Sequence, residues 1–163
     1  ACKATGVSLR RDILTMEDAG AQETMIFSDF GIVTTTSDNG PALTRSLLTD
    51  LSADRPDVIV LELGDGLLGA YGVEAILSDA SIRDAMTAVI LCANDPVSAW
   101  GGARILRDTF GIEPAVVTGP ATDNAVGIDQ INERLSIPAI NALSHGVALG
   151  DLVADLLGKK EAT

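Results

Sequence analysis

DVIVLEL, at residues 57–63, is a run of aliphatic and β-branched side chains that contains one acid near its end, Glu62. Such a run is typical of a strand buried inside a parallel sheet. Three similar runs follow at residues 88–93, 114–118 and 137–141, with amphipathic stretches between them. Strands that alternate with helices favour right-handed crossovers and a mostly parallel sheet. The sequence therefore predicts a three-layer α/β fold, with helices on both faces of the sheet.

Helices are predicted from apolar residues that recur on one helical face. Leucines place helices around residues 43–51 and 149–157, and the stretches 98–110 and 123–135 are also expected to be helical. Asp123 or Asn124 is a suitable cap for the last of these. In the first third of the chain, residues 10–19 predict a helix that stops at Gly20, and residues 38–41 predict a turn into a helix. No internal repeat or linker interrupts residues 1–163, so we expect a single domain.

The composition excludes several classes of protein. The chain has 163 residues and a formal charge of −12, from 23 acids and 11 bases, and only 3% of its residues are aromatic. Such a chain repels phosphate backbones and offers few stacking platforms, so we expect no nucleic-acid partner. Its apolar runs are too short to cross a bilayer, so we expect no membrane span. Two distant cysteines fit a reduced compartment, and we expect a cytoplasmic protein.

The residues after each strand are the first place to look for chemistry, because ligands bind at the carboxyl ends of parallel strands. Glu62 interrupts a run that reads as buried, and a buried carboxylate is costly unless it is paired or hydrogen-bonded. One interpretation is a Mg²⁺ contact or a general base, with Asp65 as its partner. The other is a solvated strand end followed by a tight turn.

Two further groups of residues leave both a functional and a structural interpretation open. Lys3, with Arg10 and Arg11 nearby, forms the one cationic cluster of an acidic chain and could hold an anionic substrate, or it could belong to a frayed terminus. His145 follows a predicted strand and could act as an acid, base or ligand, or it could serve packing at the start of a helix.

Several motifs occur together in a recognisable order: KATG at residues 3–6, RD at 11–12, PDVIVLELGDGLL at 56–68, VILCAND at 89–95 and AVVTG at 115–119. In this order they resemble the SIMIBI class of P-loop NTPase domains, of the dethiobiotin synthetase and cobyrinic acid synthase type. The resemblance covers most of residues 3–157. It implies a ligase- or synthetase-like enzyme that uses ATP and Mg²⁺ on a small-molecule substrate.

The resemblance also implies roles for individual residues. Lys3, Glu62 and Asp65 would be catalytic, and Glu62 would hold the metal. The residues implied near the acceptor substrate are Thr5, Gly6, Arg11 and Asp12. Those implied near the nucleotide are Asn94, Thr118 and Gly119.

The phosphate-binding signature G-x-x-x-x-G-K-S/T of that class does not occur in the chain. The resemblance therefore predicts that this loop, with its strand and helix, lies in a segment before Ala1, and that the chain is a fragment of a longer protein. Alone, such a fragment would be inactive and would hold neither ATP nor Mg²⁺ tightly. A complete but degenerate protein is the alternative. A non-catalytic regulatory or binding domain, similar to a receiver domain without its phosphorylation residues, is the alternative function, and a homodimer is also left open.

Overall fold

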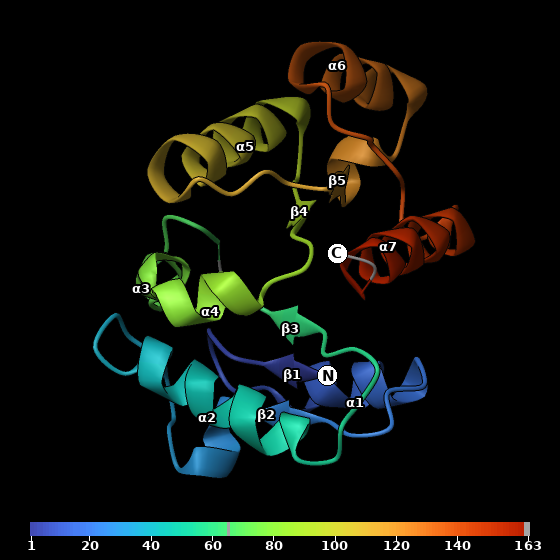
Figure 1. The fold of residues 1–163 in the computed structure, drawn as a ribbon. Helices are drawn as coiled ribbons and strands as arrows, with labels where there is room; N and C mark the ends of the chain where they lie inside the picture. Colours follow the sequence, from blue (N-terminus) through green and yellow to red (C-terminus); the bar gives the residue numbers. More distant parts are fainter. Residues whose placement is uncertain (65, 162–163) are drawn as a thin grey trace. The chain divides into compact units, whose positions relative to one another are not determined.

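The computed structural model describes residues 1–64 and 66–161. Contacts divide the chain into two compact units, unit 1 (Ala1–Ala85) and unit 2 (Met86–Thr163). Each unit combines parallel strands with helices, which confirms the α/β class (Figure 1). Within the described residues the strands form one three-stranded and one two-stranded sheet. The single domain and the continuous three-layer sheet stay predictions.

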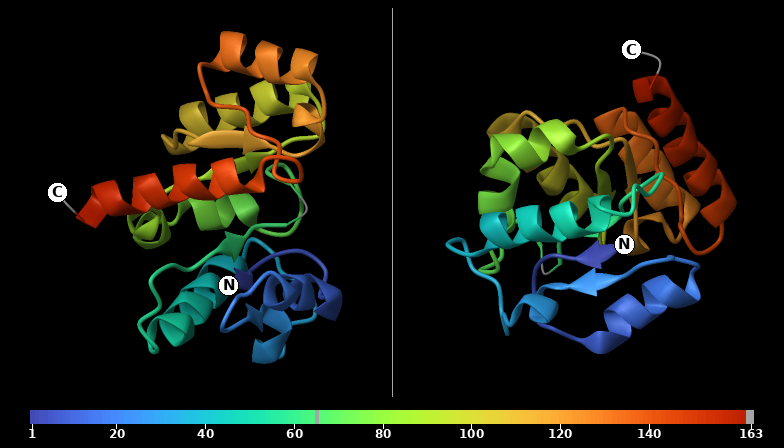
Figure 2. Two further views of the ribbon diagram at one scale, coloured as in Figure 1. Left: turned by 90° about the vertical axis from the view of Figure 1, so that its right-hand side faces the viewer. Right: turned by 60° about the horizontal axis from the view of Figure 1, so that its bottom comes forward.

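Unit 1 is built around a parallel sheet with the strand order β2-β1-β3. The strands are β1 (Cys2–Lys3), β2 (Met25–Ile26) and β3 (Leu61–Glu62). In the right-hand view of Figure 2, β1 and β2 lie between the first two α-helices. The helical elements are α1 (Arg10–Asp18), η1 (Phe27–Phe30), α2 (Gly40–Ser52), α3 (Val73–Ser78) and α4 (Ala80–Ala85). The first strand of the chain is therefore the central strand of its sheet.

The helix ends of unit 1 follow from local sequence. Helix α1 stops before Gly20, which adopts a φ of +99° that other residues rarely tolerate. Helix α2 begins at Gly40 and has Pro41 in its first turn, where a missing N–H costs nothing. Both ends agree with the sequence prediction. Apolar side chains from these helices and from β1 and β2 form the core: Cys2, Ala4, Ile13, Ile26, Phe27, Leu43, Leu47 and Leu51.

The predicted strand at 57–63 is shorter and less buried than expected. Only Leu61–Glu62 is a regular strand, and its single neighbour in the sheet of unit 1 is β1. The alternate residues Ile59, Leu61 and Leu63 pack against the core, because successive side chains of a strand point to opposite faces. Val58 and Val60 are 46% and 58% exposed. Glu62 shares their face by the same alternation, and it is half-buried rather than enclosed.

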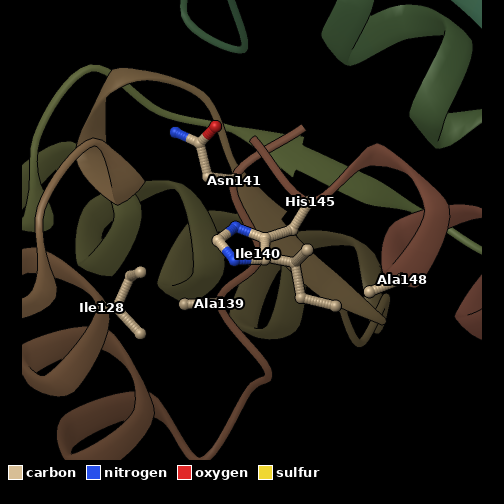
Figure 3. Close-up of a pocket in the computed structure, with 6 residues that line it drawn as sticks. All are labelled: Ile128, Ala139, Ile140, Asn141, His145 and Ala148. Carbon is tan, nitrogen blue, oxygen red and sulfur yellow. The ribbon is translucent and has the colours of Figure 1, made fainter. Parts of the chain in front are cut away.

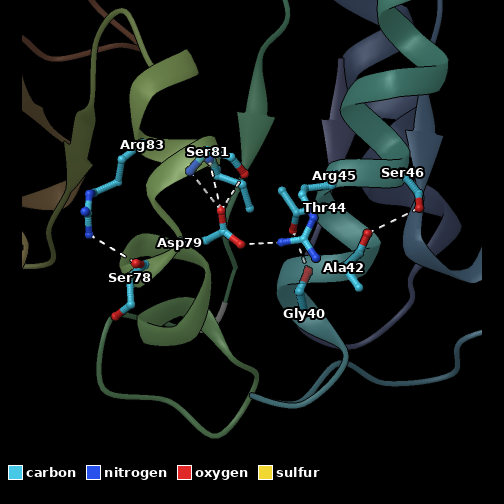
Figure 4. A network of polar contacts seen from close by, with 10 residues as sticks. Gly40, Ala42, Thr44, Arg45, Ser46, Ser78, Asp79, Ser81 and Arg83 are labelled. Atoms are coloured by element: carbon cyan, nitrogen blue, oxygen red, sulfur yellow. Dashed lines mark hydrogen bonds and ion pairs between the residues drawn. The ribbon is translucent and has the colours of Figure 1, made fainter.

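A polar network joins α2 to the α3–α4 turn (Figure 4). Arg45 forms an ion pair with Asp79, whose carboxylate also accepts hydrogen bonds from the Ser81 hydroxyl at 2.6 Å and the Ser81 amide at 3.0 Å. The Ser81 hydroxyl, helped by Arg45, lowers the pKa of Asp79 below its ordinary value. Arg83 donates to the carbonyls of Leu77 and Ser78 at 3.0 and 3.2 Å. The two short helices are thus held by side chains as well as by packing.

Unit 2 pairs β4 (Ile90–Cys92) with β5 (Val116–Thr118) in parallel. Helices α5 (Pro96–Phe110) and α6 (Ala125–Leu135) pack together on one side of these strands (Figure 1). A short η2 (Pro120–Thr122) follows β5, and α7 (Gly146–Glu161) ends the unit. Asp95 caps α5 by accepting from the Ser98 amide at 2.8 Å. Of the two predicted caps of α6, Asn124 is the one that accepts, from the Gly127 amide at 2.9 Å.

The predicted strand at 137–141 is reduced to one parallel bridge, between Val117 and Ala139. The amide of Val117 donates to the Pro138 carbonyl at 2.8 Å, and the amide of Ile140 donates to the Val117 carbonyl at 3.0 Å. Pro138 has no N–H to extend the ladder, which limits regular pairing here. The segment nevertheless runs beside β5, as the alternation of strands and helices predicts.

The two cysteines are expected to differ sharply in reactivity. Cys2 is fully buried, and burial raises the pKa of its thiol to about 11 against the opposing effect of the N-terminal ammonium, whereas Cys92 is exposed. The thiolate is the reactive form. At pH 8 we therefore expect a thiol reagent to label Cys92 quickly and Cys2 only when unit 1 opens. Mass spectrometry of wild type and Cys92→Ser would measure this, and equal labelling rates for both cysteines would contradict it.

Candidate functional site

The register of β1 and β3 places Lys3 directly beside Glu62. The amide of Ala4 donates to the Glu62 carbonyl at 3.0 Å, so the two strands remain paired up to their carboxyl ends. A Cβ built on Gly64 would lie 3.5 Å from Lys3 Cε and 3.6 Å from Glu62 Oε1. The two side chains therefore converge beside Gly64, where the absence of a side chain leaves them room. We call this group the Lys3 site: Lys3, Asp12, Glu62 and Gly64.

Asp12 is the direct partner of the Lys3 ammonium. It lies in the first turn of α1, and its carboxylate forms an ion pair with Lys3 Nζ. The Lys3 side chain is only 9% exposed and that of Asp12 is 20% exposed. An ammonium at this depth requires such a partner. Arg11, predicted near the substrate, is 82% exposed, with its Nε 3.7 Å from Asp12 Oδ1. The main interaction of Asp12 is therefore with Lys3 and not with Arg11.

Thr5 and Gly6 are used inside the fold. The Thr5 hydroxyl donates to the Gly64 carbonyl at 3.2 Å, across 59 residues of sequence. The Gly6 amide donates to the Thr35 hydroxyl at 3.1 Å. Thr5 and Thr35 are both buried. These two predicted substrate ligands therefore fix the loops that frame the Lys3 site, and Thr35 is a member of that frame that sequence reasoning missed.

The metal prediction rests on Glu62, since Asp65 lies outside the described residues. Within residues 1–64 and 66–161, no three His, Cys, Asp or Glu side chains gather where they could hold a metal ion. Mg²⁺ needs fewer protein ligands, because it usually keeps several waters and binds one or two carboxylates plus substrate phosphates. A single half-buried carboxylate beside a lysine fits that requirement.

The three residues predicted near a nucleotide lie together in unit 2, at the carboxyl ends of β4 and β5. Gly119 has a φ of +89°, and a Cβ there would lie 2.8 Å from the Ala93 carbonyl oxygen, so the two strand ends touch through backbone alone. Thr118 is buried and its hydroxyl accepts from the Ala142 amide at 3.2 Å. Asn94 is exposed, and its backbone amide donates to Ser98 Oγ at 3.1 Å. Asn94 is the one whose side chain reaches solvent.

A second polar cluster of unit 2 surrounds Asn141, which sequence reasoning did not single out. Asn141 is buried and contacts Asp123 and Ser144, and Ser144 Oγ lies 2.8 Å from His145 Nδ1. Beside it is a pocket to which Asn141 and His145 contribute (Figure 3). The sequence signal was an Asn at a strand end followed by Ser-His just before a helix.

Comparison of the chain with models of protein families, with curated proteins and with solved structures finds no match. In the part of the chain that the structure describes, every helix is too short or too polar to cross a membrane.

Proposed function

We propose that this chain carries the acceptor-substrate side of an ATP- and Mg²⁺-dependent, ligase- or synthetase-like enzyme that acts on a small molecule in the cytoplasm. The proposal includes the three-layer architecture of P-loop domains. The observation that carries it is the parallel register of β1 and β3, which sets a buried lysine beside a half-buried glutamate at the carboxyl ends of the strands. Ligands of parallel α/β sheets bind at such ends.

Each residue of the Lys3 site has its own role in this proposal. Lys3 would bind and orient an anionic acceptor, with Asp12 holding the ammonium in place. Glu62 would hold Mg²⁺, directly or through water, and the ion would neutralise charge on a phosphate when bound. Gly64 lets a substrate approach the backbone closely. In unit 2, Asn94, Thr118 and Gly119 are proposed to lie near the nucleotide, with Asn94 supplying the accessible side chain.

Calorimetry tests the proposal on the full-length protein, which would include the phosphate-binding loop that the resemblance predicts before Ala1. We expect wild type to bind ATP only with Mg²⁺ present, and Glu62→Gln to weaken that binding about tenfold or more, because the neutral amide no longer attracts the ion. Glu74→Gln, at an exposed acid in α3, is the matched control and should bind like wild type. Indistinguishable heats for Glu62→Gln and wild type would remove Glu62 from the mechanism.

A non-catalytic regulatory or binding domain is the second candidate. It is favoured by one observation: the Lys3 ammonium, the Thr5 hydroxyl and the Gly6 amide all have partners within the fold. Such a domain would show no Mg²⁺-dependent binding of ATP in the same titration. A homodimer is compatible with either function, and sedimentation of the full-length protein would show it.

A further inference from the structure

An open pocket of about 210 Å³ lies in unit 2 between α6, the segment 139–141 that follows α6, and the start of α7, where His145 and Ala148 are exposed. Its walls are mostly aliphatic, and the two polar residues on it are Asn141 and His145 (Figure 3). The residues that line it are Ile128, Ala139, Ile140, Asn141, His145 and Ala148. None of them is Lys, Arg, Asp or Glu, so the pocket favours an uncharged occupant.

Asn141 offers nothing to such an occupant, because the fold already uses its amide. Its Nδ2 donates to Asp123 Oδ1 at 2.9 Å and to the Thr122 carbonyl at 3.3 Å. Its Oδ1 accepts from the amides of Leu143 and Ser144, at 3.0 and 2.9 Å, and from Ser144 Oγ at 3.0 Å. These partners fix which end of the amide is oxygen.

The same network bears on the proton of His145. Ser144 Oγ lies 3.0 Å from Asn141 Oδ1, which can only accept, and 2.8 Å from His145 Nδ1. A hydroxyl that donates to Asn141 has no second proton, and it then accepts from the imidazole. In neutral imidazole one nitrogen donates and the other accepts. With the proton on Nδ1, the acceptor is Nε2, and it is the polar group of His145 left for a ligand.

We propose that this pocket binds a small, uncharged molecule with an apolar body and one O–H or N–H group, whose proton His145 Nε2 accepts. Drug-sized ligands occupy pockets of about 300–1,000 Å³. At about 210 Å³, this pocket suits a single ring or a short branched chain. The site belongs to unit 2 alone and is independent of the function proposed for the Lys3 site.

The protonation of each ring nitrogen of His145 can be measured without overlap, because His145 is the only histidine in the sequence. At a pH where the ring is neutral, long-range ¹H–¹⁵N correlation spectra should show the proton on Nδ1. Ser144→Ala should remove that preference, since it deletes the oxygen that accepts the proton. A wild-type ring protonated on Nε2 would overturn the proposal.

Phenol and anisole are matched probes for the ligand, since they share a ring and only phenol has a donor. Phenol should move the His145 Nε2 resonance and bind about fivefold more tightly than anisole. Ala148→Phe should abolish binding of both by filling the pocket, whereas Ala154→Phe, at an exposed position of α7, should not.

A second variant keeps the test decisive if Ala148→Phe does not fold. His145→Phe retains a ring and removes the acceptor, so phenol and anisole should bind it equally, as followed by the methyl resonances of Ile128 and Ile140. Equal binding of the two probes to wild type, or no response to phenol, would overturn the proposal.

Discussion

Gly127→Ala is expected to destabilise unit 2 by about 3 kcal/mol, the upper end for an added methyl group in a packed site. Gly127 lies in the first turn of α6, and a Cβ there would stand 2.2 Å from the carbonyl oxygen of Ala121. The two atoms nearest to that Cβ, the carbonyl oxygen and carbon of Ala121, belong to the backbone, so neither can rotate aside. The helix would have to shift away from η2, and the cap from Asn124 would be strained with it.

Trp100 makes the effect measurable, since it is the only tryptophan and lies in α5, which packs against α6. Its fluorescence during urea unfolding should show a midpoint well below that of wild type. Gly101→Ala is the matched control: nothing lies within 4 Å of its added methyl group, and alanine in a helix should stabilise by up to about 1 kcal/mol. Equal midpoints for the two variants would contradict the close contact of α6 with η2.

Asp12→Ala should destabilise unit 1 by about 2–3 kcal/mol, whereas Lys3→Met should change its stability by less than about 1 kcal/mol. The two variants should differ in stability because Lys3 is more deeply buried than Asp12. The Lys3 side chain is 9% exposed, so without Asp12 a nearly buried ammonium has lost its partner. Asp12 is 20% exposed and can turn toward water when Lys3 is replaced, while methionine keeps the aliphatic stem packed.

The labelling rate of Cys2 reports the opening of unit 1 and so measures both variants. Asp12→Ala should speed labelling strongly, and Lys3→Met/Asp12→Ala should be slower than Asp12→Ala alone, because no ammonium is then buried. If Lys3→Met opened unit 1 as readily as Asp12→Ala, the ion pair would be a stabilising contact. If it does not, the pair is dispensable for stability, which favours a chemical role for Lys3.

The helices were the most predictable part of the fold, because their signals are local. Gly20, Pro41 and Asn124 mark helix ends through their own backbone and side-chain chemistry, and the structure places ends at each. Strands were less predictable. The two residues of β1 carry no pattern, and they form a strand only because β2 and β3 pair with them. The exposure of Val58 and Val60 likewise depends on which strands lie beside them. A short stretch of sequence does not contain that information.

The candidate site divides in the same way. Glu62 was selected as an acid at a strand end, Lys3 as part of the one cationic cluster and Asp12 through the family resemblance, and the structure brings them together. Their partners could not be read from spacing, because the bond from Thr5 to Gly64 spans 59 residues and that from Gly6 to Thr35 spans 29. Asn141 was overlooked for a related reason: its role depends on Asp123, which reads as a helix cap in sequence and instead accepts from the Asn141 amide.

The central position of β1 has a consequence for the order in which the protein is made. A ribosome synthesises β1 before both of its neighbours, and one of them, β3, follows only after α1, β2, η1 and α2. During that interval β1 can pair only with β2. The Thr5 hydroxyl has no partner yet, because the carbonyl of Gly64 is synthesised after β3. In unit 2 a single helix separates β4 from β5. We therefore expect unit 1 to close more slowly than unit 2 during translation, since closing distant segments costs more chain entropy than closing near ones.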